Sequence, residues 1–223
     1  MHRTIEAVAT HSGTLRKVRR EPAKMELMKA IRIHNYGGPD VLKYEDAPRP
    51  LPQTGEVLVR VHAAGVNPFD WQVRAGYMKE FVQHKLPVIP GWDVSGIVEE
   101  IGPEVSEFKR GDEVYGKLDP KYDGAYAEYV LACESEIAVK PKSLYHVRAA
   151  AVPILALTAW QSLFGAQSSS DRLAEIGKLI DSGKFKVVLD RILPLSEARR
   201  AHELIQSGQV RGTIVLRVKD VQP

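Results

Sequence analysis

The residues of this sequence that could do chemistry are few and scattered. We interpret the five histidines at positions 34 to 202 as ordinary surface or packed residues, namely His34, His62, His84, His146 and His202. The one cysteine, Cys133, cannot form an internal disulfide or build a zinc site by itself, and it is typical of a reducing, cytoplasmic setting. Asn67-Pro68, taken alone, has the chemistry of a turn. No catalytic residue can be assigned from residue types alone.

A dinucleotide-binding turn is also missing from the sequence. A strand, a glycine-rich turn and the first turn of a helix are needed to hold a pyrophosphate. The chain has 17 glycines in 223 residues, but none of them are arranged as Gly-x-Gly-x-x-Gly. The sequence therefore predicts that a nicotinamide cofactor would be held poorly.

The elements that must position any site are short strands in the first two thirds of the chain. In residues 56–64, Val57, Val59 and Val61 share one face, whereas Arg60 and His62 lie on the other. Further strands are expected at 29–34, 41–44, 94–101, 113–115, 125–131 and 137–139. Frequent turns between short strands are typical of a barrel or sandwich.

The last third of the chain has a different character. Residues 145–164 are rich in Ala and Leu and predict helix, with a break near Pro153. After a small polar linker at 165–170, Ser170 is expected to cap a helix over 171–180, and Ser196 a second helix that ends at Gly208. Strands are expected at 213–218 and at 185–189, the latter running from Phe185 to Leu189.

Charge is concentrated at the start of the chain. Residues 1–27 hold six basic and three acidic side chains, which accounts for the whole net charge of +3 and leaves the remainder balanced. A balanced body does not suggest nucleic-acid binding. No apolar run has the length of a signal peptide or a membrane span. We expect residues 1–27 to be a disordered basic leader.

Five motifs carry a family resemblance, in the family's order. The motifs at 65–71, 90–98 and 108–114 (GVNPFDW, PGWDVSGIV and FKRGDEV) resemble the GroES-like domain of medium-chain dehydrogenases. Residues 157–160 (LTAW) resemble the segment that leads into the family's nucleotide-binding domain, and residues 183–216 resemble its C-terminus. The zinc-independent quinone oxidoreductases are the most similar branch.

The resemblance implies a reaction and site residues. In that branch, hydride moves from NADPH to a quinone or an activated alkene, so a small quinone or enone is the implied substrate. By resemblance, Asn67 lies near the nicotinamide or substrate, Thr158 hydrogen-bonds the cofactor, and Tyr77 and Trp92 line an apolar cleft. Zinc-dependent relatives carry cysteine at position 67 and His-Glu at 92–93, so Asn67 and Trp92-Asp93 predict a metal-free site.

The same resemblance implies that most of the nucleotide-binding domain is deleted near residue 164. We expect a mainly β fold with α: a GroES-like β-barrel at 28–144, a truncated α/β remnant of the nucleotide-binding domain at 145–193, and a helix and strand at 194–223 that return to the barrel. The strand at 185–189 would lack its partners and favour homo-oligomers or pairing with a full-length relative. Three interpretations stay open: an impaired quinone oxidoreductase, an active reductase whose intact product carries the glycine motif, and a non-catalytic binding or assembly module.

Overall fold

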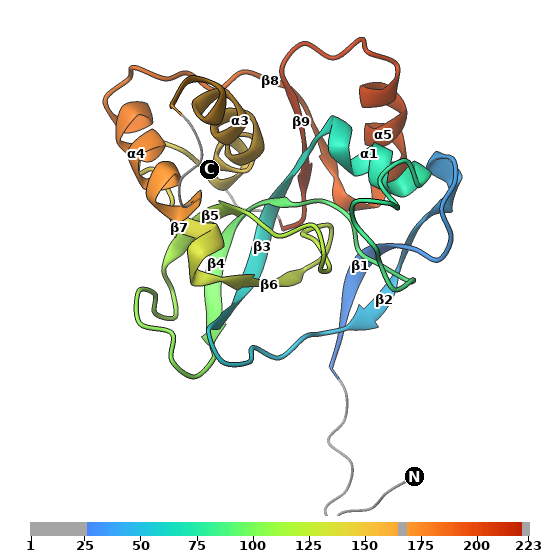
Figure 1. Ribbon diagram of the computed structural model, residues 1–223, viewed down its shortest axis with the longest axis horizontal. Helices are drawn as coiled ribbons and strands as arrows, with labels where there is room; N and C mark the ends of the chain where they lie inside the picture. Colours follow the sequence, from blue (N-terminus) through green and yellow to red (C-terminus); the bar gives the residue numbers. More distant parts are fainter. Residues whose placement is uncertain (1–25, 165–168, 220–223) are drawn as a thin grey trace, which may run out of the picture.

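The computed structural model describes residues 26–164 and 169–219, and Figure 1 shows their arrangement. The strands are β1 (Leu27–Ile33), β2 (Leu42–Pro48), β3 (Glu56–Val66), β4 (Asp93–Ile101), β5 (Glu113–Lys117), β6 (Tyr129–Cys133), β7 (Ile137–Val139), β8 (Leu189–Pro194) and β9 (Thr213–Arg217). The α-helices are α1 (Pro68–Ala75), α2 (His146–Ala149), α3 (Pro153–Phe164), α4 (Ser169–Asp181) and α5 (Ala198–Gln206). Short 3₁₀ turns η1 (Pro39–Val41), η2 (Glu134–Glu136) and η3 (Leu195–Glu197) join them.

Seven strands form one mixed sheet around β3. The order is β7-β5-β4-β3-β9-β8, and β6 pairs with β3 beyond the end of β9. Strands β1 and β2 form a separate antiparallel pair, which isolated bridges from Ala30 to Ala127 and from Ile33 to Val88 connect to the loops of the larger sheet. The strands thus wrap around a common core.

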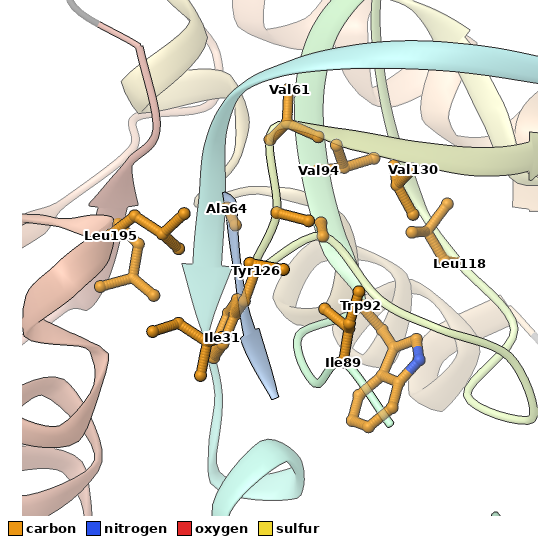
Figure 2. Packing of buried hydrophobic residues seen from close by; sticks show 14 of the residues in the cluster. Ile31, Val61, Ala64, Ile89, Trp92, Val94, Leu118, Tyr126, Val130 and Leu195 are labelled. Carbon is orange, nitrogen blue, oxygen red and sulfur yellow. The ribbon is translucent and has the colours of Figure 1, made fainter. Parts of the chain in front are cut away.

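The alternation in β3 determines which face packs inward. Val57, Val59 and Val61 are buried in the main apolar core, as their period-two spacing predicts. Figure 2 shows Val61 in this core, with Val94 and Val130 from neighbouring segments. The core therefore lies on one face of β3, and His62 on the opposite face contacts the helical segments instead.

The helices lie in two groups. Figure 1 shows α3 and α4 together beside β5 and β7, whereas α1 and α5 pack on one another near β1 and β2. Helix α2 contacts β3, β4 and β9, and so connects the first group to the middle of the sheet. The break predicted near Pro153 is present, because α2 ends at Ala149 and α3 begins at Pro153.

The strand predicted at 125–131 begins later than expected. Residues 125–128 instead run alongside β1, where the Ile31 amide donates to the Tyr126 carbonyl at 2.7 Å. Pairing with β3 starts at Tyr129. The first part of this apolar run therefore pairs with β1 and the second part with β3, and the sequence pattern does not show where one pairing ends and the other begins.

The strand predicted at 185–189 is wrong in its position. Helix α4 ends in a turn at Gly183, which has a φ of 74°, and the amides of Lys184 and Phe185 both donate to the carbonyl of Leu179. Pairing with β9 begins only at Leu189 and continues to Pro194, so β8 crosses the domain boundary predicted at 193/194. The helix cap takes up the first residues of the apolar run.

The predicted helix caps also differ from the structure. Ser196 lies inside η3, and α5 begins after Glu197 without a side-chain cap. Ser170 lies within α4, which begins at Ser169. Most of the predicted leader, residues 1–25, and of the linker, residues 165–168, lies outside the described residues. Among the residues that are described, no helix has the length and apolar character of a membrane span.

Candidate functional site

A shallow apolar pocket lies between the first turn of α1 and the outer face of α3. Its volume is about 350 Å³, and it is lined by Asn67, Pro68, Phe69, Ile154, Leu155, Thr158 and Ala159. The structure therefore brings Asn67 and Thr158 together from the two sides of the pocket, although they belong to distant segments of the chain. The remaining lining is mostly apolar, which suits a flat ring with few polar substituents.

Asn67 is held where β3 passes into α1. Its backbone amide donates to Asp70 Oδ2 at 2.8 Å, and the Asp70 amide donates back to the Asn67 carbonyl at 3.1 Å. Asp70 Oδ2 also accepts a hydrogen bond of 2.9 Å from the hydroxyl of Tyr126. Because Asn67 and Asp70 are both buried, these bonds fix the polar edge of the pocket.

Asp93 lies behind the pocket and ties its two walls together. Its Oδ2 accepts from Asn67 Nδ2 at 3.1 Å and from the Ile154 amide at 3.2 Å, and Oδ1 lies 3.1 Å from the same amide. The Asp93 carboxyl, at the start of β4, thereby caps the first turn of α3. Val152, the residue just before Pro153, has no polar side chain that could cap the helix locally. Gly65, the cross-strand neighbour of Asp93, leaves the space for it: a Cβ at Gly65 would lie 3.0 Å from Asp93 Cβ.

Both buried carboxyls bind protons more tightly than usual. Burial raises the pKa of Asp93 to about 8, against the opposing effect of the hydrogen bonds from Ile154 and Asn67. Burial likewise raises the pKa of Asp70 to about 7, although the Asn67 amide and the Tyr126 hydroxyl favour its ionised form. Two groups beside the pocket therefore exchange protons near neutral pH.

Thr158 lies on the exposed side of α3. Its side chain is open to solvent, and its backbone carbonyl accepts a hydrogen bond of 2.8 Å from Ser162 Oγ. Helix α3 is apolar on almost all sides, and Leu155, which also lines the pocket, is 51% exposed. The hydroxyl of Thr158 is thus accessible from the pocket.

The structure does not bring Tyr77 and Trp92 to this pocket. Tyr77 is 69% exposed beyond the end of α1, where it packs edge-on against Trp71. Trp92 is 1% exposed, and its indole N–H donates to the Tyr122 carbonyl at 3.1 Å. Figure 2 shows Trp92 beside Ile89 in the core. An apolar ring next to a family motif does not reveal from sequence whether it faces a cleft or the core.

The histidines are packed or surface residues. The rings of His62 and His146 lie with their centroids 4.4 Å apart and their planes tilted by 50°, and His202 packs edge-on against Tyr126. Over the described ranges, no three side chains of His, Cys, Asp or Glu are grouped so that they could hold a metal ion. Asn67, whose amide nitrogen is bonded to Asp93, and the buried Trp92 do not supply the donors that zinc prefers.

The described residues also lack a clear binding site for the pyrophosphate of a dinucleotide. Among the strand pairs of the described residues, only β8 and β9 are parallel, and α5 connects them. The turn between β8 and α5 is η3, which contains no glycine. Residues 26–164 and 169–219 therefore offer a pocket of a size and lining that suit a ring, but no glycine-rich turn that fits a dinucleotide phosphate.

Asp93 and Asp70 are the site residues that sequence reasoning did not select. The available signal was a carboxylate in an otherwise apolar stretch, at the start of β4 and in the first turn of α1. That signal becomes informative only when burial is known, because an acidic residue at the start of an element is usually solvated.

Comparisons with known families cover both halves of the chain. Residues 53–142 match the alcohol dehydrogenase GroES-like domain, and residues 136–216 match the zinc-binding dehydrogenase family. The second match begins before residue 164, where the deletion is expected, and ends after it.

Similar curated proteins are oxidoreductases of about twice the matched length. A mitochondrial NAD(P)H oxidoreductase RTN4IP1 of Dictyostelium discoideum is 36% identical over 160 residues, covering 70% of this chain and 46% of the relative. The chloroplastic quinone-oxidoreductase homolog of Spinacia oleracea is 40% identical over 165 residues, covering 74% of this chain and 48% of the relative. The chain thus spans about half the length of the curated relatives it matches.

Solved structures agree in fold. The quinone oxidoreductase from Coxiella burnetii superposes with a TM-score of 0.78 at 24% identity, covering 87% of this chain and 100% of that chain. The GroES-like fold predicted from the motifs is confirmed. The chain belongs to the medium-chain dehydrogenase/reductase superfamily, as a quinone oxidoreductase-like member.

Proposed function

We propose that this chain carries the ring-binding site of a zinc-independent, NADPH-dependent oxidoreductase, whose family reaction is hydride transfer to a quinone or an activated alkene. The observation that carries this proposal is the pocket in which Asn67 and Thr158 meet across an apolar floor. The relatives called quinone oxidoreductases, such as the mouse protein at 42% identity over 140 residues, support the same class of reaction.

The chain's own residues would bind and orient a ring. Phe69, Ile154 and Leu155 provide apolar contact on which a planar ring can lie and from which water is displaced. Asn67 and Thr158 provide the polar atoms that select one orientation of its substituents. NADPH, when bound, supplies the hydride; the protein supplies position and a dry surface.

We further propose that NADPH binds weakly and that turnover is impaired in this chain. The ring end of the cofactor would occupy the pocket, but the pyrophosphate would lack a glycine-rich turn: in the one parallel βαβ unit among the described strands, β8-α5-β9, the turn before the helix is η3, which contains no glycine. Without that contact, most of the cofactor's binding energy is absent.

Zinc independence and a cytoplasmic location are parts of the same proposal. The amide of Asn67 is engaged by Asp93 and Trp92 is buried, so neither is a metal ligand. Cys133 is exposed and has a free thiol, which agrees with a reducing compartment.

The test is a paired binding and turnover measurement on a sample of verified intact mass. At about 24.8 kDa, we expect NADPH to bind with a dissociation constant well above micromolar and duroquinone to be reduced negligibly. Duroquinone has no free ring position and so cannot alkylate Cys133. Saturable micromolar NADPH binding at this mass would overturn the proposed impairment. A larger mass with tight binding would favour the intact reductase.

A second candidate function is a non-catalytic binding or assembly module. It is favoured by β8, which forms an open edge of the large sheet with Ile192 at 47% exposure and Val188 at 64% just before it. This edge replaces residues 185–189 as the proposed pairing surface for a second copy or a full-length relative. Ile192→Lys should lower the molar mass measured by light scattering if copies pair here; an unchanged monomer in both proteins would exclude self-pairing.

A further inference from the structure

The carboxyl of Asp93 forms hydrogen bonds with two segments that line the pocket, Asn67 and the first turn of α3. The residue is 1% exposed, yet within the described ranges no Lys, Arg or His forms an ion pair with it. Instead, one oxygen atom, Oδ2, lies 3.1 Å from the amide nitrogen of Asn67 and 3.2 Å from the backbone nitrogen of Ile154. These two donors belong to opposite walls of the pocket.

We infer that Asp93 is a positioning residue that holds Asn67 and the first turn of α3 in register and turns the Asn67 carboxamide so that its oxygen is offered to the ligand. An amide has a donor end and an acceptor end. Because Nδ2 is committed to Asp93, Oδ1 is the end that remains for a bound group. Asn67 then recognises a hydrogen-bond donor, such as the carboxamide N–H of a nicotinamide ring or the hydroxyl of a hydroquinone.

The surroundings of Asp93 favour this orientation. The groups that face its carboxyl are the Ile154 amide at the start of α3, the Asn67 amide, Asp70 on α1, the hydroxyl of Tyr126, and Lys117, its register partner on β5. Lys117 favours the ionised carboxyl and Asp70 opposes it. Both hydrogen bonds to Oδ2 come from N–H donors, so Oδ2 acts as an acceptor atom at this position.

The identity of the ligand rests on the proposed function, but the role of Asp93 can be measured without any ligand. In the wild-type protein, the side-chain N–H₂ of Asn67 should exchange slowly with water, because one hydrogen is held by Asp93. In Asp93→Ala, we expect exchange to be about ten-fold faster, the equivalent of one lost hydrogen bond. Nitrogen-15 NMR of the Asn67 side chain, identified by its absence in Asn67→Asp, gives this rate.

Two variants separate positioning from charge or general disruption. Asp93→Asn can keep an oxygen at the place of Oδ2 and should restore slow exchange, whereas Asp70→Asn is the matched control. Asp70 is equally buried, but it receives the backbone amide of Asn67 and not its side chain, so exchange at Nδ2 should stay at the wild-type rate. Fast exchange in Asp93→Asn, or wild-type exchange in Asp93→Ala, would overturn the inference.

If Asp93→Ala does not fold, a pH titration of the wild-type protein followed by NMR tests the role of Asp93 instead. The Asn67 Nδ2 and Ile154 backbone resonances should shift together with one apparent pKa, and this shared titration should vanish in Asp93→Asn. Independent titrations would overturn the inference.

Ligand discrimination then tests the acceptor role. Nicotinamide should bind about five-fold or more tightly than N,N-dimethylnicotinamide, which lacks the N–H groups, and the ratio should approach one in Asp93→Ala. Equal binding to the wild-type protein would overturn the acceptor role of Asn67. Binding of neither amide would overturn the proposed function together with that acceptor role, while the exchange rates would still decide the role of Asp93.

Discussion

The ring of Tyr126 lies directly over Gly91. Gly91 has a φ of 86°, and a Cβ built on it would fall 2.1 Å from two ring carbons of Tyr126. The ring is buried and cannot move aside, since it also donates its hydroxyl to Asp70. The loop before β4 is therefore shaped by one tyrosine side chain, which connects it to the polar edge of the pocket.

Gly91→Ala should destabilise the protein by about 3 kcal/mol or more, because the methyl group meets a fixed ring in a strained backbone conformation. The matched control is Gly111→Ala: its φ is 94°, but nothing lies within 4 Å of the new Cβ. Backbone strain alone should cost the control about 1–2 kcal/mol. Urea unfolding of both variants gives the difference, and equal losses would contradict the steric argument.

Tyr126→Phe should cost about 1–3 kcal/mol of unfolding free energy, because Asp70 loses a buried hydrogen-bond donor. The hydroxyl favours the ionised form of Asp70, so the pKa of this carboxyl should rise above its wild-type value. Carbon-13 NMR of the carboxyl reads that pKa. Tyr122→Phe, at an exposed tyrosine, should change stability by less than about 0.5 kcal/mol. A lower Asp70 pKa in Tyr126→Phe would refute the assignment.

Stability should pass through a maximum near pH 6.5, from two opposing sets of groups. The folded protein keeps protons on Asp70 and Asp93 up to pH of about 7 and 8, whereas the unfolded chain releases them near pH 4. Their burial therefore removes stability as the pH rises through this range. Burial lowers the pKa of His62 and His146 to about 4 and that of His202 to about 3, so these groups remove stability as the pH falls below 6.5.

Urea unfolding at pH 5 to 9 measures this profile. As the pH rises past 6.5, the histidines of the unfolded chain lose their remaining protons and the two carboxyls dominate, so the unfolding free energy should decrease up to about pH 8. Asp93→Asn should make that decrease shallower. A steady increase from pH 6.5 to 8 in the wild-type protein would show that the carboxyls are ionised in the folded state.

Thr158→Val should weaken NADPH binding about five-fold by removing one hydroxyl from the pocket, while the unfolding free energy changes by less than about 0.5 kcal/mol at this exposed position. Thr158→Ser keeps the hydroxyl and serves as the control. NMR titration reads affinities in the weak range expected for this chain. Equal affinity of all three proteins would remove Thr158 from the site.

The sheet was largely predictable from local pattern, and the pocket only partly. Strand β3 follows from its alternating valines, and the break at Pro153 follows from the restricted backbone of proline. The position of β8 did not follow, because the cap of α4 competes with the sheet for the same apolar run. Which of the two takes these residues depends on how β8 pairs with β9 in the folded protein, and this is not visible in the local sequence.

The site residues were likewise predicted only in part. All four residues were suggested by the family resemblance: Asn67 and Thr158 meet at the pocket, whereas Tyr77 and Trp92 lie elsewhere. Asp93 escaped notice because a buried carboxylate is unfavourable by itself and becomes reasonable only beside two N–H donors.

The placement of β9 between β3 and β8 has a consequence for biosynthesis. The second half of β3, residues 63–66, pairs on one side with a strand made some 150 residues later, so this part of the edge emerges from the ribosome unpaired and stays so for most of translation, whereas β6 covers the first half earlier. Contacts so distant in sequence close slowly. The nascent chain therefore must avoid pairing this edge with other chains until β9 has been synthesised. We expect the chain to need chaperones for longer when translation between β3 and β9 is slower.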